Sequence, residues 1–326
     1  MTIGDITFSN ISKTYPGGIV ALKDFSITIP SGKITAFIGA NGSGKSTALK
    51  LLAGQSTPDS GTIDFLGVNP QEQTQQIRKN IGYITQDVGL DNEITGRESL
   101  SLFASLHGIN GTRKITVVDQ LANEYGLGEH LDKRVKSYSG GLKQRLHLTL
   151  SVIHNPAYLL LDEPTNSLDP EGKEYIWQKL SHYRDKSVII VTHDLHEAAK
   201  YCDHVVLFHK GTVLIDGHPN DIIEKDKSIQ LQINYEGLIK DQVKDQINTL
   251  EGLNRVSYSN NKILLSINEQ IYDEQLVNSV LDNATIDITE VRKHTPDLST
   301  AYFNLTGEIA QGKSTSINLK QKRKRK

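Results

Sequence analysis

The sequence predicts an α/β fold with a parallel sheet, because short apolar runs alternate with helical segments. Three runs carry the prediction: Ile34–Ile38, Tyr158–Leu161 and Val188–Val191. Each is almost continuously apolar and ends in polar residues, which is typical of strands buried on both faces. Helical segments lie between the runs. In such a sheet, the loops at the carboxyl ends of the strands are available for a ligand.

The elements around this sheet predict a large first domain. The chain has 326 residues, which suits one large or two moderate domains. Residues 4–38 alternate apolar and polar around turn residues and predict antiparallel strands. Residues 88–135 are predicted mostly helical, and Thr95 with Glu98 forms a capping-box pattern. We therefore assign residues 1–225 to this domain, with a helical subdomain at about 88–150.

After about residue 226 the pattern changes to that of a small α+β domain. The predicted order is a strand at 229–235, a helix at 237–250, a hairpin over 255–267, a helix at 271–282 and strands from 286 onward. This β-α-β-β-α-β order is typical of a ferredoxin-like domain. We assign it to residues 226–310.

Composition points to an ordinary soluble globular protein, with 37% hydrophobic and 23% charged residues. No stretch approaches the roughly 18 consecutive apolar residues that would span a bilayer. The N-terminal residues show no basic segment followed by an apolar one, so we expect no signal peptide. The single cysteine, Cys202, excludes an intramolecular disulfide and fits a reducing compartment. We expect a cytoplasmic protein.

The charge distribution argues against nucleic-acid binding. Residues 320–326 hold six cations of a chain whose net charge is -2, so the remainder carries roughly -8. Nucleic-acid binding needs a positive face, which an acidic body does not offer. Residues 311–326 are predicted to form a basic, disordered tail. Contact of this tail with an anionic membrane surface or RNA is the alternative.

The segment Gly39–Thr47 matches the phosphate-loop pattern G-x-x-x-x-G-K-[ST] between a predicted strand and a predicted helix. Its glycines let successive backbone N–H groups point at phosphate oxygens, and the helix adds the positive end of its dipole. Lys45 would place its charge on the β- and γ-phosphates, and the Ser46 hydroxyl would ligate Mg²⁺. The expected nucleotide-binding residues are Gly39, Asn41, Gly42, Ser43, Gly44, Lys45, Ser46 and Thr47.

Two acids follow the apolar run Tyr158–Leu161. Asp162 is placed to hold Mg²⁺, directly or through water. Glu163 is one residue further and turned to another face, where a carboxylate suits a general base or an orienter of the attacking water. The alternative is a solvated Asp-Glu-Pro turn at a strand end. The phosphate loop upstream favours the catalytic interpretation.

Residues 138–145 read YSGGLKQR and resemble the signature motif of the ABC ATPases, usually LSGGQ. The phosphate loop, this motif and the acid pair occur in the order and approximate spacing of that family. The resemblance covers about residues 4–220. It implies a P-loop NTPase cassette with a RecA-like core, an antiparallel β subdomain and a helical subdomain. ATP and Mg²⁺ are the implied cofactors.

Four further residues resemble functional elements of the family. Gln86 resembles the Q-loop glutamine, which contacts the metal and the attacking water; Asp169 resembles the D-loop aspartate, which communicates across a subunit interface. His193 resembles the switch histidine at the γ-phosphate, and Tyr15 the A-loop aromatic that stacks on adenine. Taken singly, each has an ordinary structural explanation. The complete ordered set favours the functional one.

The resemblance also implies a head-to-tail dimer. In it, Ser139, Gly140 and Gly141 of one subunit face the γ-phosphate that Lys45 binds in the other. A small hydroxyl and glycines at a helix N-terminus do make an anion site, which supports this assignment.

The signature departs from the family pattern at two positions, with Tyr138 in place of leucine and Leu142 in place of glutamine. Its phosphate-binding residues are intact. Because Glu163 and His193 are both present, we expect a site competent for hydrolysis.

The partners follow from the resemblance. We expect a separate integral-membrane permease, a second cassette that is a copy of this chain, and a peripheral position on the cytoplasmic membrane face. The region 88–135 is where such subunits receive the coupling helices of the permease. Residues 295–307 resemble the tail of bacterial cassettes that export antibiotics, lantibiotics, other drugs or polymers, which favours export over import.

Two other functions remain as alternatives. A soluble ABC ATPase acting on nucleic acid or ribosomes would carry a long coiled-coil insertion or two cassettes, and this sequence has neither. A nucleotide-gated binding subunit with little catalysis is disfavoured by Glu163 and His193.

Overall fold

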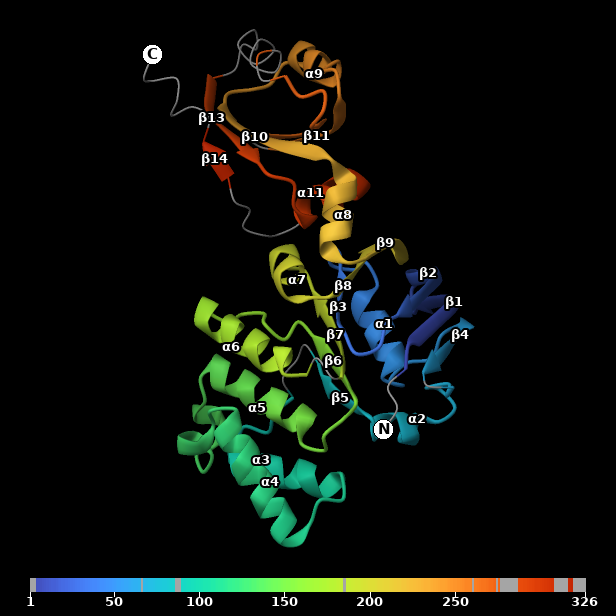
Figure 1. The fold of residues 1–326 in the computed structure, drawn as a ribbon, viewed down its shortest axis with the longest axis vertical. Coiled ribbons are helices and arrows are strands. Elements are labelled where there is room, and N and C mark those ends of the chain that lie inside the picture. The colour runs from blue at the N-terminus through green and yellow to red at the C-terminus, as the bar shows by residue number, and fades with distance from the viewer. Residues whose placement is uncertain are drawn as a thin grey trace. The chain divides into compact units, whose positions relative to one another are not determined.

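The chain forms two compact units, each described here by itself (Figure 1). The first comprises Met1–His193 and Tyr201–Asp216, and the second comprises Asp194–Lys200 and Gly217–Lys326. The computed structural model describes residues 4–65, 67–85, 89–183, 186–259, 261–273, 275, 287–307 and 316–318.

A six-stranded sheet in the order β5-β6-β7-β3-β8-β9 is the centre of the first unit. The four pairings β5–β6, β6–β7, β7–β3 and β3–β8 are parallel, and every residue of β3, β6 and β7 is buried. The predicted α/β fold with buried parallel strands is therefore confirmed. The strands are β3 (Ile34–Ile38), β5 (Ile81–Ile84), β6 (Tyr158–Asp162), β7 (Ser187–Thr192), β8 (His204–His209) and β9 (Thr212–Gly217).

A second, antiparallel sheet has the order β2-β1-β4. Its strands are β1 (Ile6–Tyr15), β2 (Ile19–Ile29) and β4 (Ser60–Phe65). Helix α1 (Lys45–Leu52) lies between the two sheets (Figure 1), and its buried side chains share one apolar core with both. The phosphate loop joins β3 to α1, so its position is set by the packing of α1 against the two sheets.

The predicted helical subdomain contains α3 (Gly96–Leu106), α4 (Gly111–Glu124) and α5 (Gly140–Val152), with single 3₁₀ turns at Gly128–His130 and Val135–Ser137. The capping box at the start of α3 is present, since Thr95 accepts from the Glu98 N–H and Glu98 accepts from the Thr95 N–H. The other helices of this unit are α2 (Thr74–Arg78) and α6 (Pro170–Ser181).

The second unit is built on a sheet in the order β11-β12-β10-β13-β14 with antiparallel pairing throughout. The predicted strand, helix and hairpin are present, and a strand follows near residue 286. The predicted helix at 271–282 lies outside the described residues except for 271–273 and 275. The elements are β10 (Ser228–Glu236), α9 (Asp241–Asn248), β11 (Leu253–Ser259), β12 (Lys262–Asn268), β13 (Asp287–His294) and β14 (Ser316–Asn318).

Three further helices of the second unit lie among its described residues: α7 (Leu195–Tyr201, of which Tyr201 belongs to the first unit), α8 (Pro219–Asp226) and α11 (Leu298–Thr306). Helix α11 contains most of the 295–307 segment and packs against α8 and β10. Asn304 of α11 donates to Asp226 Oδ1 and to Ser228 Oγ, at 2.6 Å each. The segment therefore connects α8 and β10 through packing and hydrogen bonds in this unit.

Within the predicted disordered tail, Ser316–Asn318 forms β14 instead, because its backbone groups pair with those of β13. The rest of the 311–326 segment lies outside the described residues. Over the residues that are described, no helix combines the length and the apolar character needed to cross a bilayer.

Candidate active site

The phosphate loop has a backbone that only glycine adopts without strain. Gly39, Gly42 and Gly44 have φ angles of 156°, 79° and 107°. A Cβ on Gly39 would lie 2.4 Å from the Phe208 carbonyl oxygen, and one on Gly44 would lie 2.4 Å from that of Ala21. Positive φ disfavours a side chain at all three positions, and lack of space also excludes one at Gly39 and Gly44. The loop predicted from the pattern is thus formed by the packing of β2 and β8 against it.

Lys45 is the first residue of α1 and points into the loop. Its Nζ donates to the carbonyl oxygens of Gly39 at 2.8 Å and Ala40 at 3.0 Å. Burial lowers the pKa of Lys45, while the charges of Glu163 and Asp162 act in the opposite direction. A buried cation satisfied only by neutral carbonyls gains more from an anionic partner. A phosphate entering the loop would supply one.

Ser46 and Asp162 meet between α1 and the carboxyl end of β6. Ser46 Oγ donates to Asp162 Oδ1 at 3.1 Å, and Asp162 is 3% exposed. Burial raises the pKa of Asp162, and the bond from Ser46 opposes that shift. Oxygen ligands of this kind are those that Mg²⁺ prefers, and a cation would offset the cost of burying the carboxylate. These two residues therefore fit the predicted metal site.

Glu163 and His193 emerge side by side from neighbouring parallel strands, because Asp162 pairs with Val191 in the β6–β7 register. His193 Nδ1 lies 3.0 Å from Glu163 Oε1 and 2.9 Å from Oε2. Glu163 has φ of 53°, held by its N–H donating to the Val191 carbonyl at 2.9 Å. A left-handed glutamate is costly unless its surroundings hold it, and such residues gather at active sites. Together, the backbone hydrogen bond of Glu163 and the two contacts of its carboxylate with His193 restrict the orientation of the carboxylate.

Tyr15 ends β1 next to the start of α1. Its hydroxyl accepts from Thr47 Oγ1 at 3.5 Å, and its ring is half-buried. The predicted adenine-stacking residue is thus attached to the phosphate-loop helix, although the two positions are 32 residues apart.

Ser139 is the N-cap of α5, the helix of the signature motif. Its Oγ accepts from the Leu142 N–H at 3.3 Å, and both Ser139 and Gly140 are exposed. The first turn of α5 thus presents a hydroxyl, two glycines and free backbone N–H groups to the surface, as an anion site requires.

Tyr138, which departs from the family pattern, is accommodated by its surroundings. The ring is 6% exposed, and its hydroxyl donates to the His130 carbonyl at 2.7 Å. A Cβ on Gly96 would lie 2.3 Å from that hydroxyl. The larger side chain is therefore matched by a glycine at the start of α3.

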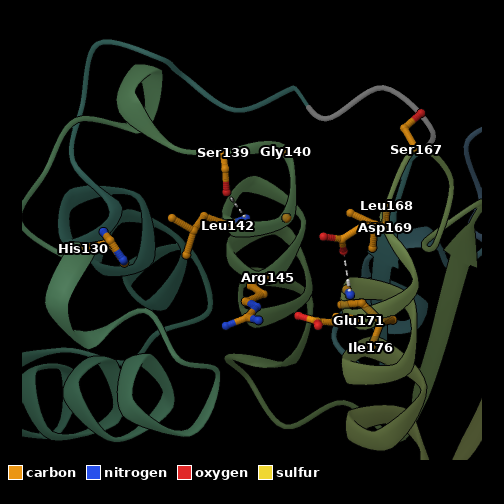
Figure 2. A pocket seen from close by; sticks show the side chains of 12 residues that line it. His130, Ser139, Gly140, Leu142, Arg145, Ser167, Leu168, Asp169, Glu171 and Ile176 are labelled. Carbon is orange, nitrogen blue, oxygen red and sulfur yellow. Dashed lines mark hydrogen bonds between the residues drawn. The ribbon is translucent and has the colours of Figure 1, made fainter.

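Asp169 is the N-cap of α6, where it accepts from the Gly172 N–H at 2.8 Å. Helices α5 and α6 begin on the two sides of a cleft of about 490 Å³ (Figure 2). The cleft is lined by His130, Ser139, Gly140, Gly141, Leu142, Arg145, Ser167, Leu168, Asp169, Glu171, Gly172 and Ile176.

The site residues thus fall into two groups. Tyr15, the phosphate loop, Asp162, Glu163 and His193 meet around the carboxyl ends of β3, β6 and β7. The signature residues and Asp169 line the cleft, and the residues described as lining it include none of the first group. Gln86 lies outside the described residues.

Arg145 and Tyr175 were not predicted from the sequence. The Arg145 guanidinium carbon lies 3.8 Å from the centroid of the Tyr175 ring, which joins α5 to α6. The two residues are 30 positions apart in different helices, so no local pattern could have paired them.

Comparison with known proteins shows one consistent set of relatives. A family model described as ABC transporter matches residues 22–166. The Nod factor export ATP-binding protein I of Rhizobium etli is 36% identical over 223 residues, which are 68% of this chain and 70% of that protein. The protein of the same name from Burkholderia lata is 32% identical over 228 residues, covering 69% and 75%.

Solved structures agree. The ATP-binding subunit of an ABC transporter superposes with a TM-score of 0.62 at 27% identity, covering 69% of this chain and 93% of that one. The ATP-binding cassette MJ0796, in a dimeric post-hydrolysis state with ADP and Pi, gives a TM-score of 0.61 at 26% identity, covering 65% and 98%.

Proposed function

The chain belongs to the ATP-binding subunits of ABC transporters, and from this premise we propose that it drives export through a separate membrane permease as one half of a pair of cassettes. The observation that carries the proposal is the division of phosphate-binding chemistry into two half-sites on one chain. Each half-site is incomplete for a triphosphate held on both sides. Two chains arranged head to tail would complete both.

The first half-site would hold the nucleotide. The ATP phosphates would replace the Gly39 and Ala40 carbonyls as partners of Lys45. Ser46 and Asp162 would hold Mg²⁺, with Gln86 as a further ligand; bound there, the ion would neutralise charge on the β- and γ-phosphates. Tyr15 would stack on the adenine.

Glu163 and His193 would carry the chemical step. Glu163 accepts a proton from the water that attacks the γ-phosphorus, with Gln86 orienting that water. The water oxygen forms the new bond as the bond to the β–γ bridging oxygen breaks, and ADP leaves with that electron pair. His193 holds the Glu163 carboxylate in place, as its contacts of 2.9 and 3.0 Å indicate, and contacts the γ-phosphate.

The second half-site would close over the partner's nucleotide. Ser139, Gly140 and Gly141 would place the first turn of α5 on the γ-phosphate bound by Lys45 of the other subunit. Asp169, across the cleft from Ser139, would meet the same interface. Dimer closure then depends on ATP, because neither surface alone satisfies the phosphate charge.

We propose that the outward face of α3 and α4 docks the permease at the cytoplasmic face of the membrane. Leu102, Phe103 and Leu106 of α3 and Ile115 of α4 are exposed by 52%, 39%, 71% and 59%. Leu100 and Ala104 of the same helix are buried, so α3 contributes to the core and also carries exposed apolar side chains. A cytoplasmic helix of the permease, with an apolar face, would cover them.

Transport is favoured over a soluble role on nucleic acid or ribosomes by the relatives, which are named as export ATP-binding proteins. The substrate of this chain's permease is a separate matter, because the substrate contacts would lie in that permease.

The decisive experiment compares the wild type with Glu163→Gln. The variant should lose ATP turnover while retaining ATP binding, and should accumulate as an ATP-dependent dimer by size-exclusion chromatography with light scattering. His209→Gln, a change at a half-buried histidine at the end of β8, is the control and should turn over normally. Undiminished turnover by Glu163→Gln, or a nucleotide-bound monomer, would contradict the assignment.

A further inference from the structure

Arg145 extends from α5 to α6 and stacks on an aromatic ring. Its guanidinium carbon lies 3.8 Å from the centroid of Tyr175. A planar, weakly hydrated guanidinium suits this contact better than an ammonium group. In Figure 2, Arg145 lies between the two helices, where it lines the cleft. The contact with Tyr175 therefore joins a residue that lines the cleft to α6.

The segment that follows α4 packs closely against the Arg145–Tyr175 contact. A Cβ on Gly126 would lie 2.9 Å from Arg145 Nη1 and 3.6 Å from the Tyr175 hydroxyl. The same hydroxyl donates to the Glu124 carbonyl oxygen at 3.5 Å. The guanidinium and the ring are thus both in contact with the segment that follows α4, which restricts how far either can move.

A second set of contacts fixes α6 to the same segment. Lys179 Nζ lies 5.6 Å from the centroid of Tyr175 and 5.3 Å from that of Tyr125. Tyr125 is fully buried, and its hydroxyl is 2.6 Å from that of Tyr183. Tyr175 is therefore a fixed platform for Arg145 rather than a mobile surface ring.

The position of the contact along the two helices gives it a geometric consequence. Arg145 is six residues after Ser139, and Tyr175 is six residues after Asp169. At 1.5 Å per residue, the contact therefore lies about 9 Å along each helix from its N-cap. A change in this contact would change the separation and relative tilt of the two N-termini.

We propose that Arg145 and Tyr175 are a positioning pair that sets the spacing of Ser139 and Asp169, so that both meet the partner subunit's nucleotide at once. This inference rests on the proposed function, because it assumes that two cassettes close over ATP. In this proposal the pair acts indirectly, without contact to the nucleotide. It acts by holding two helix starts in the arrangement that the closed dimer requires.

The test measures ATP-driven dimerisation in the Glu163→Gln background, which separates closure from turnover. Arg145→Met and Tyr175→Leu should each raise the ATP concentration for half-maximal dimerisation about three- to tenfold, the range expected for losing one partly desolvated cation–π contact. Tyr175→Phe keeps the ring and should stay within about twofold. Binding of a fluorescent ATP analogue to the monomer should not change, because Lys45 and Ser46 are untouched.

A double variant distinguishes a pair from two separate effects. If the residues act through one contact, Arg145→Met with Tyr175→Leu should be no weaker in dimerisation than the worse single variant. Multiplicative losses would contradict the pair. The matched control is Lys293→Met, which removes another cation–π contact, of 4.6 Å to Tyr272, in the second unit and should leave dimerisation unchanged.

Two failures are distinguishable. If the Glu163→Gln parent does not dimerise with ATP, the proposed function fails. If the parent dimerises and folded Arg145→Met and Tyr175→Leu match it, the positioning role fails. Should Arg145→Met lower the melting temperature steeply, Arg145→Lys, which keeps the charge but not the planar group, must show a smaller shift in the same direction.

Discussion

At the scale of single residues, Tyr83 of β5 has a hydroxyl that the folded chain buries without a hydrogen-bond partner among the described residues. Burial, assisted by the charge of Asp162, raises the pKa of Tyr83 to about 12. The ring itself packs against the core around α1. The buried hydroxyl therefore destabilises the fold, because an unpaired polar group loses its hydration without compensation, while packing of the ring stabilises the fold.

Tyr83→Phe should accordingly raise the free energy of unfolding by about 1 kcal/mol, because it removes the unpaired hydroxyl and keeps the ring. Urea denaturation followed by circular dichroism measures the change. Tyr125→Phe is the control: Tyr125 is fully buried, and its hydroxyl is bonded to that of Tyr183 at 2.6 Å. That variant should be destabilised, and a loss of stability in Tyr83→Phe as well would show that its hydroxyl has a partner after all.

His154 makes stability depend on pH. Burial and the neighbouring His107, whose ring stacks on it at 3.7 Å, lower the pKa of His154 from 6.5 to about 4. Between these values the unfolded chain takes up a proton that the folded chain does not. The free energy of unfolding should therefore fall as the pH is lowered from about 6.5 towards 4.

His154→Gln should flatten that fall, because glutamine can still donate to the Ile81 carbonyl, which His154 Nε2 approaches at 3.1 Å, but does not titrate. Part of the slope should remain, since burial also lowers the pKa of His147 to about 4. Denaturation curves at a series of pH values provide the measurement. His182→Gln, at an exposed histidine, should retain the wild-type slope; equal slopes in both variants would refute the assignment.

At the scale of elements, the segment that resembles the tails of exporter cassettes forms α11, which is part of the core of the second unit. The side chains of Leu298, Ala301, Tyr302 and Phe303 are buried, and Asp297 caps the helix through the Thr300 N–H. The helix thereby packs α8 against β10 within the second unit.

Asn304→Ala should loosen this arrangement by about 2 kcal/mol, because it removes one bond to the Asp226 carboxylate and one to the Ser228 hydroxyl. Amide hydrogen exchange in α11 and the start of β10 should accelerate, while exchange in the parallel sheet of the first unit should not. Leu305→Ala, at a neighbour exposed by 43%, is the control. Equal exchange rates in the two variants would show that the Asn304 hydrogen bonds do not stabilise α11.

At the scale of the whole molecule, the apolar face of α3 should decide assembly rather than catalysis. Leu106 is 71% exposed, the largest exposed fraction among the four apolar side chains of the proposed docking face. Leu106→Asp should therefore abolish copurification with the permease while leaving the ATP turnover of the isolated subunit unchanged. Lys114→Asp on α4, which introduces the same side chain with a larger change of charge, is the control. If Leu106→Asp still copurified with the permease, the docking surface would not include the exposed side chains of α3.

Much of the first unit was predictable, because its signals are local. The spacing of the glycines and the following lysine identify the phosphate loop, and almost continuously apolar runs identify β3, β6 and β7. Strands β4 and β9 were not predicted, since β4 is mostly exposed and β9 is half-buried except at the exposed Asp216, so neither carries an apolar pattern.

The sequence by itself determined which residues are candidates for the reacting groups: Lys45, Ser46, Asp162 and Glu163 are recognisable from neighbours along the chain. Only the tertiary structure decided the contacts between distant residues, such as His193 with Glu163 and Arg145 with Tyr175. The physical reason is that a motif depends on backbone geometry over a few residues. A contact between helices or strands depends instead on strand order and packing, which no local pattern records.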